Sequence, residues 1–135
     1  MTYETEVNNK MLLDFKSNKP IYIQLAESIE DDILKDVFEE ESQIPSTTEL
    51  SVSLKINPAT SAKGVGLLVD EKIVYKKRGV GMFVSIGAKK IITDKRRKAF
   101  YSDYVLALLD EAKKLNISSA DIICMIERGG QNERN

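Results

Sequence analysis

Two helix starts lie only eleven positions apart in this chain, and a change of hydrophobic period follows them. Ser46-Thr47-Thr48-Glu49 has the S-x-x-E form of a capping box, in which the serine hydroxyl and the glutamate carboxylate satisfy backbone amides at a helix start. Asn57-Pro58 places a capping residue before a proline at the first helical position. We therefore predict a short helix after Ser46 and a second over 58–71, and two helices joined by so short a turn form a helix-turn-helix.

The segment after Lys72 alternates with the period of a β-strand. Ile73-Val74-Tyr75 and Met82-Phe83-Val84 are β-prone runs on either side of a basic, glycine-containing stretch, so they predict a hairpin, or wing. Gly79-Val80-Gly81 resembles a fragment of a phosphate-binding loop. Such loops lead from a strand into a helix, however, whereas strand sequence flanks this one on both sides.

Helical periodicity extends over much of the remaining sequence. A helix over 20–36 is expected to begin at Pro20, and 11–15 is compatible with a short strand. Residues 99–115 predict another helix, ended by Asn116, a residue that tolerates the left-handed cap position. A last helix is expected to begin at Ser118 and to end before Gly129-Gly130, and 129–135 is expected to be disordered. The expected fold is mostly α with a small β-hairpin. It comprises a winged helix-turn-helix domain over 11–86, a basic connector over 87–98 and a two-helix C-terminal dimerisation tail over 99–128.

Charge is distributed unevenly along the 135 residues, although the net charge is only −1. Residues 44–98 hold 12 basic and 4 acidic side chains, a net charge of +8, whereas residues 1–43 carry −7. A local positive field attracts a polyanion whatever the overall charge. Charge alone is better explained by solvated lysine faces, but together with the predicted helix-turn-helix and wing it makes double-stranded DNA the expected partner. RNA binding is less favoured because the basic segment lacks exposed aromatic side chains.

The predicted DNA contacts come from both helices and the wing. The N-terminal residues of a recognition helix meet base edges in the major groove, which favours Asn57, Thr60 and Lys63. Asn57 and Thr60 could instead serve only as caps. We expect Ser46, Thr47 and Thr48 to lie at the DNA backbone, and Lys77, Arg78 and Gly79 to approach phosphates or the minor groove.

The tail carries more apolar residues than a monomer of this length needs, which predicts a homodimer. The expected dimerisation residues share one helical face: Tyr101, Tyr104, Val105, Leu108, Ala112 and Leu115. A ligand pocket closed by Phe100, Tyr101 and Tyr104 is the alternative. Cys124 lies in an apolar run and is expected to be a buried small hydrophobe.

Several classes of function are excluded by composition. The chain has no histidine and one cysteine, so it cannot form Cys/His metal sites or Ser-His and Cys-His nucleophile pairs. We expect no enzyme activity, no metal and no cofactor. No apolar run is long enough for a membrane span, and the polar, acidic first residues do not form a signal segment, so a cytoplasmic protein is expected.

Four motifs together resemble the GntR family of regulators, and specifically its short YtrA-like branch. Pro20-Ile21-Tyr22-Ile23-Gln24-Leu25 is similar to the family's P-I-Y-x-Q-I/L, and Ile44-Pro45-Ser46 with Glu49-Leu50 to L-P-S-x-R-E-L. Asn57-Pro58 with Thr60 and Lys63 resembles N-P-N-T-x-x-K, and 78–84 resembles R-G-V-G-T-F-V. The resemblance implies a dimeric winged-helix repressor without a large effector domain; any small-molecule effector stays undefined.

Departures from the family pattern fall on the expected DNA-reading surface. Thr48 stands where an arginine is usual, Ala59 replaces the usual asparagine, and Ala62 replaces a frequently polar position; Gly64 and Gly66 occupy helix-interior positions. By its place in the motif, Ala59 still counts among the expected DNA-binding residues. These changes leave an alternative function open, a winged-helix protein-interaction module that has lost much of its DNA readout.

Overall fold

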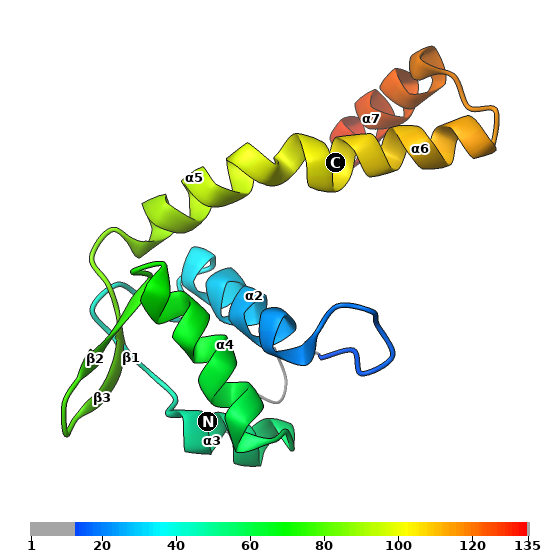
Figure 1. Cartoon of the computed structure of the whole chain (residues 1–135). Coiled ribbons are helices and arrows are strands. Elements are labelled where there is room, and N and C mark those ends of the chain that lie inside the picture. The colour runs from blue at the N-terminus through cyan, green and yellow to red at the C-terminus, as the bar shows by residue number, and fades with distance from the viewer. Residues whose placement is uncertain (1–12, 135) are drawn as a thin grey trace. The chain divides into compact units, whose positions relative to one another are not determined.

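The computed structural model describes the backbone of residues 13–134 and the side chains up to residue 130. The chain divides into two compact units, Met1–Thr93 and Asp94–Asn135 (Figure 1). Unit 1 contains α2 (Ile21–Leu34), β1 (Gln43–Ile44), α3 (Thr47–Leu54), α4 (Pro58–Asp70), β2 (Val74–Lys77) and β3 (Gly81–Val84). Helix α5 (Ala88–Phe100) begins in unit 1, and η1 (Tyr101–Val105), α6 (Leu106–Lys114) and α7 (Ser119–Arg134) follow in unit 2.

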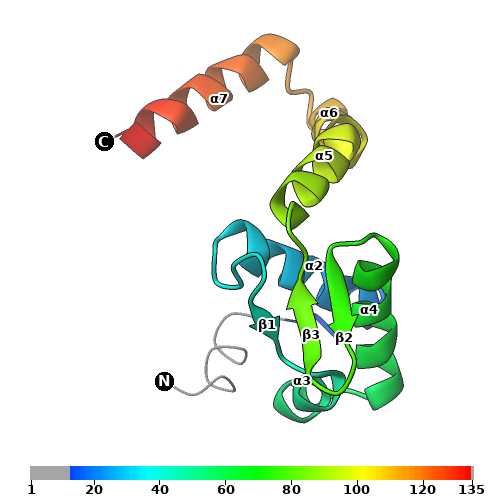
Figure 2. The same ribbon diagram turned by 90° about the vertical axis from the view of Figure 1, so that its left-hand side faces the viewer.

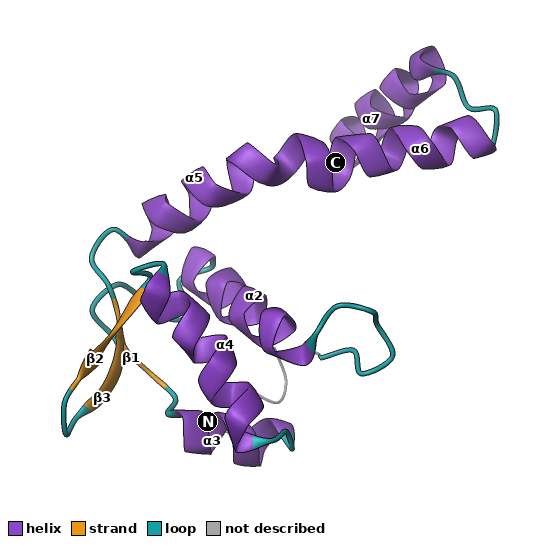
Figure 3. Ribbon diagram, viewed as in Figure 1, coloured by secondary structure: helices purple, strands orange, loops and turns teal. Residues whose placement is uncertain are grey.

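The predicted fold class is confirmed: the chain is mostly helical, with one small antiparallel sheet (Figure 3). The sheet has the order β1-β3-β2, with Val74 opposite Val84 and Lys77 opposite Gly81 in the hairpin. Strand β1 was not expected, because two residues are too short to show a period. Its position is fixed by pairing with β3, where Gln43 lies opposite Phe83.

The core of unit 1 is built from the apolar faces of its helices and the hairpin. Leu25, Ile29 and Ile33 of α2 are fully buried with Leu68 of α4 and Val84 of β3. This burial is the main source of stability, at about 1.5–3 kcal/mol for each large apolar side chain. Helix α4 packs against both α2 and α3.

The segment expected to be a basic connector, 87–98, is instead mostly helical. Ala88 and Ile92, one turn apart in α5, are fully buried in the core of unit 1. The Glu40 carboxylate accepts hydrogen bonds from the backbone N–H groups of Gly87 and Lys89, and the Lys89 ammonium pairs with Asp36 at 3.0 Å. The start of α5 is thus capped by a residue 47 positions earlier, a partner that local sequence cannot indicate.

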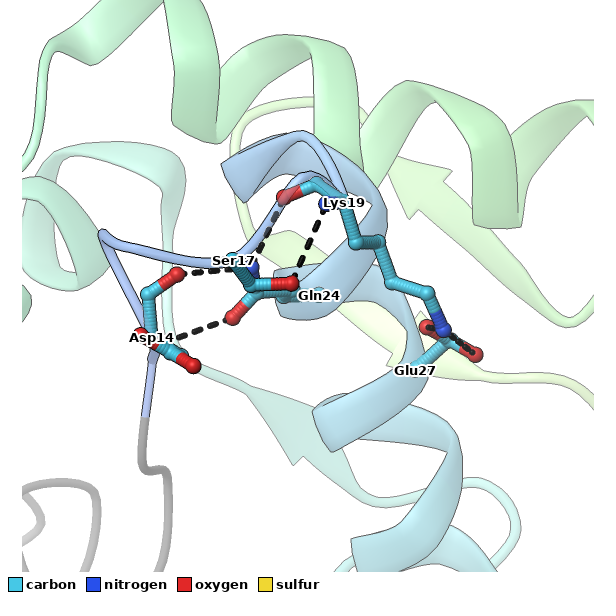
Figure 4. Close-up of polar contacts among 5 residues, drawn as sticks. All are labelled: Asp14, Ser17, Lys19, Gln24 and Glu27. Carbon is cyan, nitrogen blue, oxygen red and sulfur yellow. Dashed lines mark hydrogen bonds and ion pairs between the residues drawn. The ribbon is translucent and has the colours of Figure 1, made fainter. Parts of the chain in front are cut away.

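The chain before α2 is held by Gln24, the glutamine of the P-I-Y-x-Q motif (Figure 4). Its Oε1 accepts from the Asp14 N–H at 2.7 Å, and its Nε2 donates to the carbonyls of Asp14 and Lys19 at 3.0 and 2.8 Å. These bonds stabilise a turn, so the strand expected at 11–15 is wrong for the part described. Met11 and Leu12 lie outside the described residues.

The described elements of unit 2 are all helices, joined by a loop between α6 and α7. Their bounds differ from those expected from the sequence. The predicted helix over 99–115 is interrupted by the wider π-turn of η1. Tyr104 of η1 contacts Phe100 at the end of α5, with ring centroids 5.4 Å apart and the rings tilted by 38°. Asn116 has φ +56°, the left-handed conformation predicted for it after the helix end. Helix α7 continues through Gly129 and Gly130, where an end followed by disorder was expected.

Candidate nucleic-acid interface

The start of α3 is the predicted capping box, and the structure confirms it. The Glu49 N–H donates to the Ser46 hydroxyl at 3.0 Å, and the Ser46 N–H donates to the Glu49 carboxylate at 3.2 Å. Ser46 therefore uses its side chain to fix the helix start. Thr47 and Thr48 follow in the first turn, half-buried and exposed respectively.

The start of α4 also carries the predicted cap. The Asn57 Oδ1 accepts from the Ala59 N–H at 2.8 Å, and Pro58 occupies the first helical position. The capping role weighed for Asn57 is therefore real, while its side chain as a whole stays exposed. Thr60 is half-buried and Ala59 is exposed on the same turn. Helices α3 and α4 are joined through Lys55, which has φ +56°, and through a hydrogen bond of 2.8 Å between the buried Ser51 and Ser61 hydroxyls.

Lys63 of α4 is exposed but its position is restricted. Its Nζ lies 4.1 Å from the centroid of the Tyr22 ring, a cation–π contact of about 0.5–1 kcal/mol at an exposed site. The contact depends on a close approach of the two helices, since a Cβ at Gly64 would lie 2.8 Å from the Tyr22 carbonyl oxygen. Sequence reasoning missed Tyr22 because the two residues lie on different helices and follow no shared period.

The wing carries three exposed cations, Lys76, Lys77 and Arg78, which differ in how they are restrained. The Lys77 Nζ lies 5.1 Å from the centroid of the Phe83 ring, which itself stacks on Tyr75 at 5.9 Å. Arg78, next along the tip, is exposed and has no ion pair or hydrogen bond within the part of the chain that the structure describes. Gly79 has φ +77°, which lets the tip turn sharply after the arginine.

Tyr75 lies on the sheet face behind the wing tip. Its hydroxyl donates to the Glu41 carboxylate at 3.4 Å. Partial burial raises the pKa of Tyr75 above its ordinary value of 10.0, and the negative charge of Glu41 raises it further. Tyr75 therefore stays a neutral donor at physiological pH, and the positive charge of the wing comes from its lysines and Arg78 alone.

The elements that carry the expected DNA-binding residues lie at one end of unit 1. In Figures 1 and 2 the hairpin tip, α3 and the N-terminal part of α4 all lie at the same end of this unit. This arrangement places an exposed, capped helix start beside a basic wing. Across the described residues, no set of three His, Cys, Asp or Glu side chains is placed to hold a metal ion, and no described helix is long and apolar enough to cross a membrane.

The expected dimerisation residues do not all lie on the surface of the single chain. Tyr101, Tyr104, Leu108 and Leu115 are exposed, and Val105 is half-exposed. Ala112 is only 5% exposed, so it belongs to the interior of unit 2 and not to an exposed face. The expectation that Cys124 is buried is wrong, because it is exposed, whereas Ile122 is the buried residue among the α7 side chains that the structure describes.

A capped two-helix motif beside a basic β-hairpin defines a winged helix-turn-helix protein of the DNA-binding class. The family model "Bacterial regulatory proteins, gntR family" matches residues 21–84. A solved structure from Bacteroides thetaiotaomicron, of a transcriptional regulator assigned to the GntR family, is 35% identical, with a TM-score of 0.67 over 84% of this chain and 98% of that chain. The chain belongs to the GntR family, and it is a DNA-binding transcriptional regulator.

Two relatives from Bacillus subtilis differ in how far the similarity extends. The HTH-type transcriptional repressor YtrA is 25% identical over 127 residues, which cover 90% of this chain and 98% of YtrA. The regulator YurK is 34% identical over 73 residues, which cover 54% of this chain but only 30% of YurK. The chain thus spans under a third of YurK and nearly the whole of YtrA, a short regulator. Both relatives are named as transcriptional regulators.

Proposed function

We propose that this regulator is a repressor that binds its operator as a homodimer held together by unit 2. The observation that carries the dimer is the exposure of apolar side chains in this unit. Ten large apolar side chains are at least 38% exposed, whereas Ala112 and Ile122 are the buried apolar residues among those described there. Helices with so little interior gain stability by burying their apolar faces against a copy of themselves.

The repressor role is supported by the similarity to YtrA over almost its full length. A dimer seated on a promoter would repress by excluding other proteins from the same DNA. Because its binding partner is DNA, we place its action in the bacterial cytoplasm. The chemistry of the site fits duplex DNA, as the wing presents Lys77 and Arg78 and α4 presents Lys63 as exposed cations of unit 1.

Each element has a distinct proposed contact. The N-terminal part of α4, with Asn57 at its cap, Thr60 in the first turn and Lys63 in the second, enters the major groove. The first turn of α3, with Thr47 and Thr48, approaches the DNA backbone. Arg78 of the wing, having no partner in the described chain, meets phosphate or the minor groove. Two copies would then read two half-sites about one helical turn apart.

The test combines sedimentation with selection of bound DNA from a random-sequence pool. We expect the wild-type chain to sediment as a dimer and to select a palindromic site. Tyr104→Asp introduces a charge at a side chain that is 67% exposed in the single chain, and we expect it to yield monomers that bind the full site much more weakly. Lys113→Glu, at an exposed residue outside the expected dimerisation set, is the control and should dimerise normally.

Two results would contradict the proposal. A Tyr104→Asp protein that remains a stable dimer would show that this face is not the interface. A wild-type dimer that prefers no duplex over any other would favour the protein-interaction module over the repressor.

A further inference from the structure

The backbone of the wing tip contains two glycines with positive φ angles. Gly79 and Gly81 adopt φ +77° and +144°, conformations that L side chains rarely adopt, and they flank Val80. One turn hydrogen bond closes the tip, from the Val80 N–H to the Lys77 carbonyl at 2.9 Å. Glycine loses more conformational entropy on ordering than any other residue, so a tip with two glycines tends to be mobile. Arg78, which has no ion pair or hydrogen bond in the described part of the chain, lies within this tip.

A side chain from β1 restrains the tip from the neighbouring strand. Gln43 pairs with Phe83 of β3, and its Nε2 donates to the Val80 carbonyl at 3.0 Å across 37 positions of sequence. The amide lies directly over Gly81, where an added Cβ would overlap Gln43 Nε2. Strand β1 runs beside β3 along the hairpin (Figure 2), so Gln43 reaches the tip without leaving the sheet.

We infer that Gln43 is a positioning residue for DNA binding, which acts by holding the wing tip in the conformation that presents Arg78. The inference rests on the proposed contact of the wing with DNA. The carbonyl of Val80 and the two glycine torsions decide where the tip points, and the Gln43 amide fixes that carbonyl. Ordering the tip before DNA arrives removes part of the entropic cost of binding. Gly81 has no side chain, and this leaves the room that the Gln43 amide occupies.

The deciding measurement on the free protein is backbone order at the tip, taken from NMR relaxation of the full chain. We expect the amides of Arg78, Gly79 and Gly81 to have order parameters near those of a rigid backbone, about 0.85, in the wild type. Gln43→Met keeps the length of the side chain and removes the donor, and it should lower these values toward about 0.6. Ser42→Ala, one residue earlier, is the matched control and should leave the tip ordered.

Duplex binding tests the consequence through a double-mutant cycle. We expect Gln43→Met to weaken binding to the selected site about 3- to 10-fold, the range of one hydrogen bond, with unchanged sedimentation. In the Arg78→Ala background the same substitution should cause almost no further loss, because the cation that Gln43 positions is absent.

Two results would overturn the inference. Unchanged tip order in Gln43→Met would show that the hydrogen bond does not restrain the wing. An equal loss of affinity in both backgrounds would mean that Gln43 acts on DNA without Arg78. If the wild type binds no duplex at all, the proposed function fails, and the order parameters alone still decide whether Gln43 restrains the tip.

Discussion

At the scale of single residues, the two interior glycines of α4 differ in whether their surroundings leave room for a side chain. A Cβ at Gly64 would lie 2.8 Å from the Tyr22 carbonyl oxygen and 3.1 Å from Leu25 Cδ2, so the contact between α2 and α4 needs a glycine. A Cβ at Gly66 would meet no heavy atom within 4 Å, and nothing in the structure explains this glycine. The sequence alone presents both simply as poor helix formers.

This contrast gives a prediction for a matched pair of variants. Gly66→Ala should stabilise the chain by about 0.5–1 kcal/mol through helix propensity. Gly64→Ala gains the same propensity but forces backbone apart, at a cost of about 1–3 kcal/mol, and should be destabilising overall. Chemical denaturation of both variants measures the difference. Equal effects of the two substitutions would show that the close approach at Tyr22 is not a constraint.

At the scale of elements, the joint between α3 and α4 depends on a buried hydroxyl pair. Ser61 is fully buried and bonds to Ser51, whereas Ser51 also donates to the Thr47 carbonyl at 2.8 Å. Ser51→Ala leaves the Ser61 hydroxyl buried without a partner and should cost about 1–3 kcal/mol of unfolding free energy. Ser61→Ala should cost less, because Ser51 keeps its bond to Thr47. Denaturation should also show the double variant to be less destabilised than Ser51→Ala; additive losses would rule out this coupling.

The start of α5 depends on pH through Glu40. Hydrogen bonds from the N–H groups of Gly87 and Lys89 lower the pKa of Glu40 below its ordinary value of 4.5. A lowered folded pKa stabilises the fold above pH 4.5, and this contribution is lost as the pH falls through the folded pKa. Glu40→Gln should therefore lower Tm at neutral pH, and its difference from the wild type should disappear in acid.

Thermal melting across a pH series measures this difference. The neighbouring Glu39→Gln is the control, since this exposed side chain has no hydrogen bond in the described part of the chain. A Tm difference for Glu40→Gln that is the same at every pH would contradict the assignment.

Elements whose signals are local could be predicted from the sequence, and those set by distant partners could not. The caps at Ser46 and Asn57 and the hairpin at 74–84 follow from residue types at short spacing, and they were found where expected. Strand β1 and the start of α5 depend on β3 and on Glu40, far away in sequence. The site follows the same division: Lys63 and Arg78 were expected, but the contacts of Tyr22 and Gln43 with α4 and the wing arise only from tertiary packing.

At the scale of the whole molecule, charge is separated along the chain more than its net value of −1 suggests. If the excess of +8 over residues 44–98 acts on DNA, the logarithm of affinity should fall linearly with the logarithm of salt concentration, with a slope of about −0.9 for each neutralised phosphate. Arg78→Ala should reduce this slope by about one for each protomer that binds. Affinity measured over a salt series checks both, and affinity that does not change with salt would contradict an electrostatic interface.

Dimerisation has a consequence for stability that a monomer would not show. Unit 1 has a continuous core, but Ala112 and Ile122 are the buried apolar residues described in unit 2. In the proposed homodimer, burial against a second copy supplies most of the stability of unit 2. Because association stabilises by mass action, Tm should rise with protein concentration, and more steeply for the unfolding transition of unit 2 than for that of unit 1.

Calorimetry and circular dichroism over a hundredfold range of concentration measure this dependence. Tyr104→Asp should abolish it and leave unit 2 partly unfolded at any concentration, while unit 1 keeps its own transition. Both effects follow from the exposed apolar surface of unit 2, which is unfavourable in water unless a second copy covers it. A Tm that does not depend on concentration, in a protein that sediments as a monomer, would mean that unit 2 is stable alone despite its exposed leucines and tyrosines.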